Sequence, residues 1–327
     1  MKRVLNWTAA ILIFIMLPVS CRAAEALVPV GRIIGLQLKS DAVTVAAFDD
    51  VLGREAKDAG LRIGDQILAV NNCPIREAED VVQALEGKST AVVTVRRGGR
   101  QTTLKIPLQT TADGQRLGVY LRQGIGGIGT VTWYDPETGS FGALGHGVND
   151  SSGTLLRMNG GSAYDAFVES VKKGKAGAPG QLRGCADSPQ ACGELLWNTP
   201  QGVFGKTGQG WEGDAMPVAE FDEVTVGPAT IRATVQMGEP QDYSVEISKI
   251  YARDRSDGRN FLLRVTDPRL LEATGGIVQG MSGSPIIQDG KLVGAVTHVL
   301  TGDPARGYGL GISSMLSAGQ ETSEAAA

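Results

Sequence analysis

Short apolar runs separated by glycine-rich turns fill most of the chain after residue 108. Turn sequences such as Asp135–Gly139 and Gln288–Gly290 divide these runs. Many short strands with few convincing helices predict an all-β barrel or sandwich over residues 109–316. The candidate strands, rich in β-branched residues, are 118–121, 129–133, 229–235, 243–250, 261–265 and 292–299.

The preceding stretch, residues 27–108, mixes strands with helical segments. Glu77–Leu85 has the periodicity of a helix, with Val81 and Leu85 on one face, and Gly87 is placed to end it. We therefore expect a small α/β domain ahead of the β domain. Its candidate strands are 43–47, 67–70, 91–96 and 102–106.

The two ends of the chain have patterns of their own. Lys2 and Arg3 precede an apolar run over residues 4–19, and small residues follow it. This order is typical of a secretory signal, and the run is short for a membrane-spanning helix of about 20 residues. We expect residues 1–26 to be a cleaved signal peptide or a retained membrane anchor, so that the rest of the chain is exported. The small, acidic residues 317–327 are expected to form a flexible tail.

Composition narrows the class of protein. The chain has 327 residues, 42% of them hydrophobic, which is enough for a sizeable core and suggests about two domains. Glycine contributes 45 residues, about twice its ordinary share, as expected for many tight turns. The formal net charge of −4 argues against a basic surface for nucleic acid, so no nucleic-acid partner is expected.

Cysteine and histidine are scarce. Cys185 and Cys192 enclose a small loop, and in an exported domain such a pair is a candidate disulfide. The only histidines are His146 and His298, and neither cysteine has a further metal ligand beside it in the sequence. We therefore expect no metal site and no cofactor.

One motif in the α/β domain resembles the PDZ hallmark. Residues 59–71 read Ala-Gly-Leu-Arg-Ile-Gly-Asp-Gln-Ile-Leu-Ala-Val-Asn. The resemblance implies a groove that binds a peptide as an added strand, with backbone amides receiving its carboxylate. The alternative is that Ile34 and Leu36 are only the inward side chains of a strand. The expected groove residues are Ile34, Gly35 and Leu36 on a strand, and Val81 and Leu85 on the helix.

The β domain contains the sequence Gly280-Met-Ser-Gly-Ser-Pro285. A serine between glycines on a tight turn can project its hydroxyl while neighbouring amides face the same space. Ser282 is therefore the candidate nucleophile, with the amides of Gly280 and Ser282 as an oxyanion hole. The pattern resembles that of chymotrypsin-like serine peptidases. The alternative is an ordinary β-turn with a solvated serine.

The candidate general base is His146, which lies between two glycines in Gly142–Asp150. It precedes Ser282 in the chain, as the histidine of a chymotrypsin-like peptidase does. His298 lies in the apolar run 294–300, where a buried structural role is expected. The alternative that His298 serves Ser282 stays open.

A longer resemblance extends over nearly the whole chain. The stretch Thr266–His298, together with 127–132, 142–146 and 198–206, is similar to the stage IV sporulation protein B (SpoIVB) peptidase family. The resemblance implies a mainly β chain, in which a PDZ domain (27–108) precedes a chymotrypsin-like serine peptidase domain (109–316). It places the catalytic residues at His146, Asp267 and Ser282. Spacing alone leaves the acid open among Asp187, Asp214, Asp222, Asp242 and Asp254.

The family resemblance also implies a cellular role. Its members are serine endopeptidases exported from the forespore into the space between its two membranes. They cleave themselves, and they act on a membrane-bound processing complex to trigger activation of the late mother-cell sigma factor. The implied partners are this complex, other protein or peptide substrates, and for the PDZ domain a peptide ligand or the chain's own N-terminal region. The competing hypothesis is a non-catalytic exported PDZ scaffold that recruits membrane partners.

Overall fold

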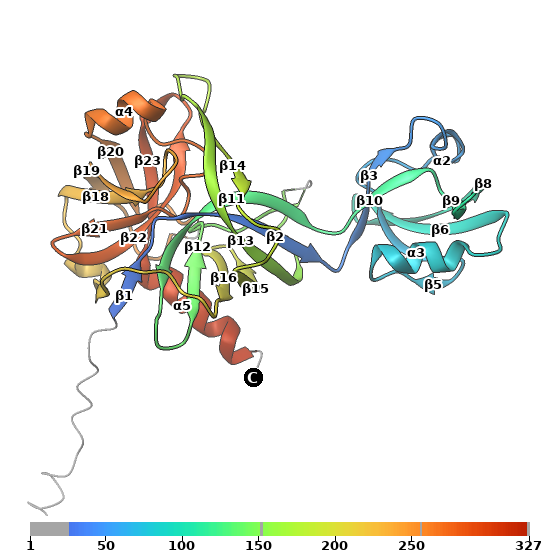
Figure 1. The fold of residues 1–327 in the computed structure, drawn as a ribbon, viewed down its shortest axis with the longest axis horizontal. Coiled ribbons are helices and arrows are strands. Elements are labelled where there is room, and N and C mark those ends of the chain that lie inside the picture. Colours follow the sequence, from blue (N-terminus) through green and yellow to red (C-terminus); the bar gives the residue numbers. More distant parts are fainter. Residues whose placement is uncertain (1–25, 151–152, 256, 326–327) are drawn as a thin grey trace, which may run out of the picture.

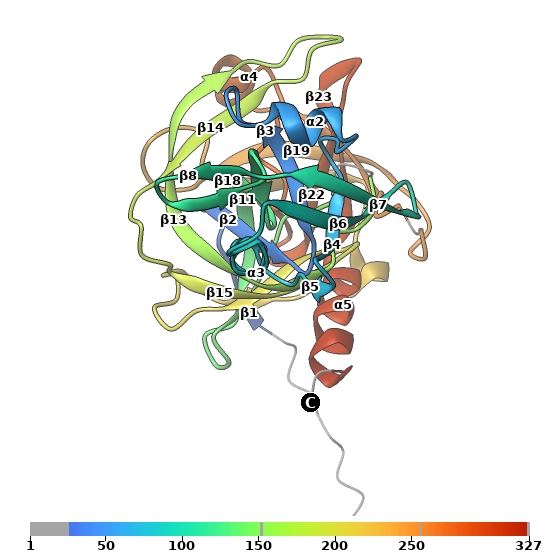
Figure 2. The same cartoon turned by 90° about the vertical axis from the view of Figure 1, so that its right-hand side faces the viewer.

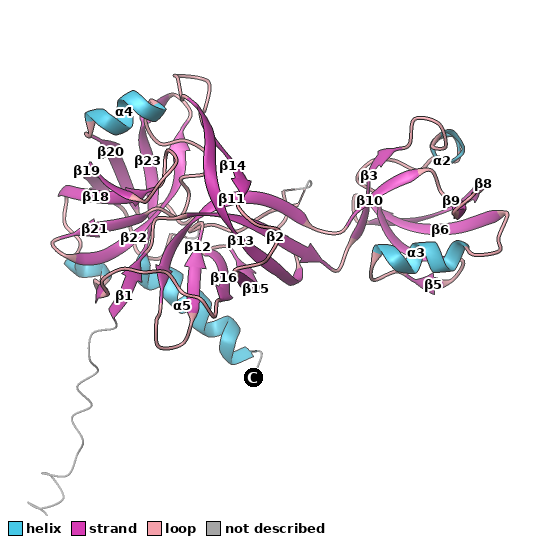
Figure 3. Ribbon diagram, viewed as in Figure 1, coloured by secondary structure: helices cyan, strands magenta, loops and turns pink. Residues whose placement is uncertain are grey.

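The computed structural model describes residues 26–150, 153–255 and 257–325 (Figure 1). The expected signal peptide or anchor lies outside these residues, except Ala26. No helix in the described part of the chain is long and apolar enough to cross a membrane. The expected flexible tail is helical instead, because helix α5 (Ile312–Ala325) contains most of it. Strands dominate the molecule (Figure 3), in agreement with the predicted mainly β class.

The first of two barrels closes through six antiparallel strands. Each pairs with the next around a circuit that returns to its start. Val131, Phe141 and Leu195 are fully buried in its core. In circuit order the strands are β2 (Ile33–Ser40), β11 (Ile125–Tyr134), β12 (Ser140–Ala143), β16 (Gly202–Lys206), β15 (Gly193–Thr199) and β13 (Met158–Lys172), and β1 (Ala26–Pro29), β14 (Gln181–Ala186) and β17 (Met216–Pro217) extend the sheet.

The second barrel is also closed and six-stranded. Its core includes Ile231, Ile247, Phe261 and Leu263, all without exposed surface. The predicted all-β barrel is thus confirmed, as a pair of barrels. The strands in circuit order are β18 (Gly227–Ala233), β19 (Gln241–Ile250), β20 (Phe261–Val265), β23 (Asp303–Gly311), β22 (Lys291–Leu300) and β21 (Pro285–Gln288). The 3-10 turn η1 (Phe221–Glu223) precedes β18, and helix α4 (Pro268–Thr274) lies between β20 and β21 in the chain.

A separate unit, residues 43–122, projects from the first barrel, and we call it the inserted unit (Figures 1 and 2). It has its own core, which includes Val81, Leu85 and Val93. A buried Asp65 receives the Arg97 guanidinium at 2.6 Å and ties two of its strands together. Its elements are β3 (Val43–Phe48), α2 (Arg54–Asp58), β4 (Gln66–Val70), β5 (Cys73–Pro74), α3 (Ala78–Leu85), β6 (Thr90–Arg97), β7 (Arg100–Pro107), β8 (Gln109–Thr111), β9 (Gly114–Arg116) and β10 (Val119–Arg122).

The inserted unit interrupts the first barrel, so the predicted domain range of 27–108 is wrong at both ends. Strand β2, expected in the PDZ domain, pairs with β11 on one edge and with β13 on the other. Residues 109–122, expected in the peptidase domain, belong to the inserted unit. A strand has the same alternating pattern in either sheet, and only long-range pairing decided which one β2 joined.

The expected carboxylate-binding amides are wrong for the same reason. Gly35 lies opposite Ile128 on one side and Tyr164 on the other, in the middle of a continuous sheet. Ile34 and Leu36 are 0% and 4% exposed, so they are inward side chains of the barrel, which was the alternative reading. No unpaired peptide edge is left there for a ligand.

The expected disulfide between Cys185 and Cys192 is also wrong. Cys185 lies on β14 opposite Phe167, whereas the amide of Cys192 donates to the carbonyl of Ala163. Ala163 and Phe167 are four positions apart on β13, about 13 Å at the usual strand rise. Disulfide-bonded Cα atoms lie about 4.4–6.8 Å apart. Both thiols are accordingly free.

Candidate active site

Ser282 lies on the turn that leads from α4 into β21, where the two barrels meet. The amide of Thr130 in the first barrel donates to the Ser282 carbonyl at 3.0 Å. Gly283 has a φ of +97°, and a Cβ there would lie 2.0 Å from the Thr130 carbonyl oxygen, so only glycine fits. Ser282 is half-buried and its Oγ donates to the Thr297 carbonyl at 2.8 Å. Ser284 is fully buried and cannot meet a substrate in this conformation.

Two amides of this turn are free to bind an anion. Within the described residues, Met281, Gly283 and Ser284 donate their N–H groups to backbone carbonyls, whereas Gly280 and Ser282 donate to none. These are the two amides that the sequence predicted for an oxyanion hole. A φ of +98° at Gly280 turns the backbone so that the two N–H groups are left unpaired.

His146 reaches the same place from the first barrel. It follows β12 through two residues with positive φ, Leu144 at +70° and Gly145 at +67°. Its Nδ1 lies 3.0 Å from the Gly147 carbonyl oxygen, which assigns the proton to Nδ1 and leaves Nε2 as the acceptor. Burial lowers the pKa of His146, and the bond to Gly147 offsets this only in part. The imidazole is therefore neutral at pH 7 and suited to act as a base.

His298 lies beside His146 and lines the same cavity, whereas its apolar strand suggested a buried structural role. The two ring centroids are 5.4 Å apart, with the planes tilted by 39°. His298 is half-buried, and its buried Nδ1 has no hydrogen-bond partner among the described residues. Burial and the neighbouring His146 lower the pKa of His298 to about 4. Two neutral imidazoles thus share the site.

All of these groups line one hollow of about 450 Å³, which we call the Ser282 cavity. Ser282, His146, His298 and Gly280 face it together. None of its lining residues is Asp, Glu, Lys or Arg. Half of its lining residues are apolar side chains from both barrels: Leu36, Leu38, Ile125, Ile128, Leu144, Val148, Ile277, Val278 and Val299.

The structure does not bring the predicted acid, Asp267, to this site. Its carboxylate accepts hydrogen bonds from the Arg269 backbone and guanidinium and from the Ser244 amide, at 2.8–3.2 Å. Neither histidine is among its partners, and it does not line the Ser282 cavity. Asp267 is instead the N-cap of α4, with Pro268 at the first helical position. An Asp-Pro pair before a helix is the sequence signature that identifies this role.

Asp267→Asn should therefore affect stability more than activity. Arg269 lowers the pKa of Asp267 to about 2, so the carboxylate stabilises the folded state above its unfolded pKa near 3.8. This contribution is lost as the pH falls through about 2. We expect the variant to lose about 1–2 kcal/mol at pH 7 and the deficit to shrink toward pH 2. Denaturant unfolding over this pH range measures it. If the variant is inactive but as stable as the wild type, Asp267 acts in catalysis and the prediction is wrong.

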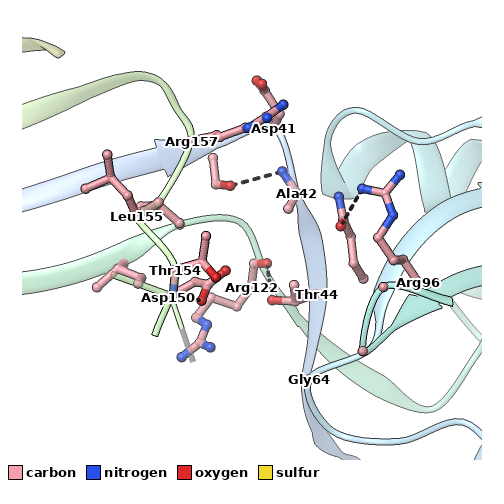
Figure 4. A pocket seen from close by; sticks show the side chains of 17 residues that line it. Asp41, Ala42, Thr44, Gly64, Arg96, Arg122, Asp150, Thr154, Leu155 and Arg157 are labelled. Carbon is pink, nitrogen blue, oxygen red and sulfur yellow. Dashed lines mark hydrogen bonds between the residues drawn. The ribbon is translucent and has the colours of Figure 1, made fainter. Parts of the chain in front are cut away.

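A second cavity, of about 770 Å³, lies where the inserted unit joins the first barrel (Figure 4). Arg96, Arg122 and Arg157 line it together with Asp41 and Asp150, so it carries charges of both signs. Its arginines are exposed, and no histidine or cysteine lines it. The candidate nucleophile, the candidate base and the two unpaired amides all lie at the Ser282 cavity instead.

Two family models match parts of the chain. Residues 113–316 match the family model of the SpoIVB peptidase S55, and residues 56–97 match a PDZ domain model. A crystal structure of the PDZ domain of the SdrC-like protein from Listeria monocytogenes is similar at 20% identity. The match covers 26% of this chain and 90% of that one, with a TM-score of 0.22. A comparison with curated proteins found no match.

Proposed function

Because the chain belongs to the SpoIVB peptidase S55 family and is a serine peptidase, we propose that Ser282 is its nucleophile and His146 its general base. One observation carries this assignment. Ser282, His146 and the oxyanion residue Gly280 line the same cavity, although they come from different barrels. N-terminal sequencing of fragments from the purified protein and from its Ser282→Ala variant tests it, because only the first sample should contain new N-termini.

The first half-reaction begins with the Ser282 hydroxyl. In the structure its Oγ donates to the Thr297 carbonyl, so attack requires a rotation about Cα–Cβ that turns the hydroxyl toward His146 Nε2. Oγ then bonds to the carbonyl carbon of the scissile peptide while His146 takes the proton. The amides of Gly280 and Ser282 stabilise the oxyanion. His146 passes the proton to the leaving nitrogen, and the peptide bond breaks.

The second half-reaction uses the same groups with water. His146 takes a proton from a water molecule, whose oxygen attacks the acyl carbon, and it then returns the proton to Ser282. The Gly147 carbonyl holds the His146 ring in the required tautomer throughout. In this proposal a backbone oxygen performs the orienting role that the family resemblance gives to Asp267.

The substrate side chain next to the attacked carbonyl should be apolar. The Ser282 cavity has no charged side chain on its walls, and Ile277 and Val278 beside the oxyanion amides are 2% and 1% exposed. A charged side chain placed there would lose hydration without gaining a partner. We expect peptides with Leu, Val or Phe at this position to be cut at least about 100-fold faster than peptides with Asp or Lys. A series of peptides that differ only at this residue measures the preference.

For the inserted unit we propose that the ligand-binding edge is β10. The unit's sheet runs β10-β3-β4-β6-β7, so β10 is a terminal strand with one edge unpaired. The side chains of Gln115 and Gln123 accept hydrogen bonds from the amides of Gly87 and Ala78, at the two ends of α3. These bonds keep α3 alongside the residues that flank β10. An extended peptide ligand would add to this edge as a further strand.

The insertion makes a sharp prediction about domain removal. Leu38 of β2 lies opposite Ile125 of β11, so a short turn can join the two strands directly. Replacing residues 41–123 by a glycine-rich turn should leave a folded peptidase that still cuts a short unstructured peptide. Deleting 27–108 should instead abolish folding, because it removes the central strand β2. Thermal unfolding and peptide hydrolysis of both variants check this. If the two variants are equally stable and equally active, the conclusion that the PDZ-like unit is inserted into the first barrel is wrong.

We further propose the cellular role that the family suggests. The chain would be exported from the forespore, cleave itself, and cut a membrane-bound processing complex to trigger late sigma-factor activation. The apolar run over residues 4–19 and the family match support this role. The test is a sporulating strain that carries the Ser282→Ala chain, which should localise normally and fail to activate the sigma factor. Full activation by this variant would favour the non-catalytic scaffold.

A further inference from the structure

An unpaired strand edge leads away from Ser282 toward the inserted unit. Strand β11 pairs with β2 over Ile125–Thr130, whereas on its other side β12 begins pairing only at Val131. Thr130 uses this other side to donate to the Ser282 carbonyl and to accept from the Leu144 amide. Peptide groups alternate along a strand, so Ile128 and Gly126 present their N–H and C=O groups to the same side. No strand of the described residues pairs with them there.

The surface beside this edge is hollow and open. A second hollow, of about 830 Å³, is lined by β11 residues 125–128 and by residues 121–124 at the end of the inserted unit. Both hollows are lined by Ile125, Gly127 and Ile128. Gly126 and Gly127 are exposed and have no side chain to keep a second backbone away. An extended chain can therefore approach within hydrogen-bonding distance of β11.

The reaction determines which part of a substrate lies here. His146 must protonate the leaving nitrogen, and it belongs to the first barrel, as β11 does. The fragment that begins with this nitrogen, C-terminal to the cut bond, therefore lies over the first barrel. Starting beside Ser282 and Thr130, it would run toward Ile125, opposite to the direction of β11. That orientation is the one required for antiparallel pairing.

We propose that the substrate segment immediately C-terminal to the scissile bond adds to β11 as an antiparallel strand, bonding to Ile128 and Gly126, and points toward the inserted unit. This inference rests on the proposed roles of Ser282 and His146. Only Gln123 and Gly124 separate β11 from β10, so a substrate on this edge would reach the inserted unit within a few residues. The inserted unit then meets the substrate on the C-terminal side of the cut.

Two variants at one position test the pairing. Gly126→Pro removes the N–H that faces the substrate and leaves the β2 pairing intact, because that N–H points away from β2. Gly126→Ala is the matched control: it keeps the N–H, and its Cβ would meet the nearest atom, the Leu36 carbonyl oxygen, at an ordinary 3.8 Å. A cleavage site is first mapped in β-casein. Peptides are then made that share the sequence N-terminal to the scissile bond and carry one to five residues C-terminal to it.

With the full chain, we expect kcat/KM to rise at least about tenfold as the segment lengthens from one to four residues, because it gains two pairs of hydrogen bonds. Gly126→Ala should keep this rise and Gly126→Pro should lose most of it. The proposal is overturned if kcat/KM of the full chain does not change with segment length. It is also overturned if kcat/KM of a folded Gly126→Pro variant rises as much as that of the wild type.

N-methylated peptides provide a second test that does not depend on a folded variant. Methylating one amide at a time, from the second to the fifth residue after the cut, should lower kcat/KM at alternate positions only, because alternate N–H groups of a strand face its partner. Equal effects at all four positions overturn the pairing. Cleavage that survives Ser282→Ala, or no cleavage of any peptide, would instead refute the proposed catalytic roles on which the pairing rests.

Discussion

Ser282→Ala should abolish peptide hydrolysis and self-cleavage while the protein stays folded. The hydroxyl is the only nucleophile on the turn that faces the Ser282 cavity, and its loss leaves only the oxyanion amides and binding. In the best-studied serine triads such a change costs about 10⁶-fold in kcat. Alanine removes one hydroxyl that is bonded to the Thr297 carbonyl, so the melting temperature should change little. Single-turnover kinetics and thermal unfolding of the purified variant measure both effects.

Ser284→Ala is the matched control, two residues away on the same turn. Ser284 is 0% exposed, and its Oγ has no hydrogen-bond partner among the described residues. Removing a buried hydroxyl that is unpaired should be neutral or slightly stabilising, and activity should persist. If Ser284→Ala is inactive while Ser282→Ala cleaves, the nucleophile has been placed two residues too early.

His146→Ala should lower kcat nearly as much as Ser282→Ala, because members of a catalytic group act as a unit. The base must be neutral, and burial holds the pKa of His146 below its ordinary 6.5. The wild-type rate should therefore rise with pH through a value below 6.5 and then level off. A pH–rate profile of the wild type, with kcat of the variant at pH 7.5, measures both parts of the prediction.

His298→Ala separates the two histidines. His298 does not bond to Ser282 Oγ, and its ring lies against His146, so its loss should disturb the orientation of that ring. We expect kcat to fall much less than in His146→Ala. The pH at which the rate rises should differ from that of the wild type. If His298→Ala is the inactive variant and His146→Ala is active, His298 is the base that serves Ser282.

The sequence by itself indicated the local features of the proposed site. A serine between glycines marked the candidate nucleophile, and the two amides expected for an oxyanion hole, those of Gly280 and Ser282, donate to no backbone carbonyl in the structure, because backbone angles that favour glycine are a local property. Gly145 and Gly147, on either side of His146, likewise indicated that this histidine is the candidate base. The PDZ motif at 59–71 identified a unit with its own core, since alternation and turn residues within about 80 positions specify such a sheet.

Asp267 shows where local patterns become ambiguous. An Asp before Pro is suited to cap a helix, and the family resemblance also placed the catalytic acid there. Only the folded chain distinguishes the two roles, because the difference lies in whether Ser244 and Arg269 or a histidine surrounds the carboxylate. The same holds for Cys185 and Cys192, which are close in sequence but opposite different residues of β13.

Tertiary structure also decided where the chain is divided and which groups share a cavity. The pattern of Ile33–Ser40 is satisfied in any sheet with one buried face, and pairing with β11 and β13, far along the chain, assigned it to the first barrel. The same pairing made the PDZ-like unit an insertion beside the free edge of β11. The approach of His298 to His146 depends equally on contacts between the two barrels. Such contacts form through burial between distant segments, which no local spacing encodes.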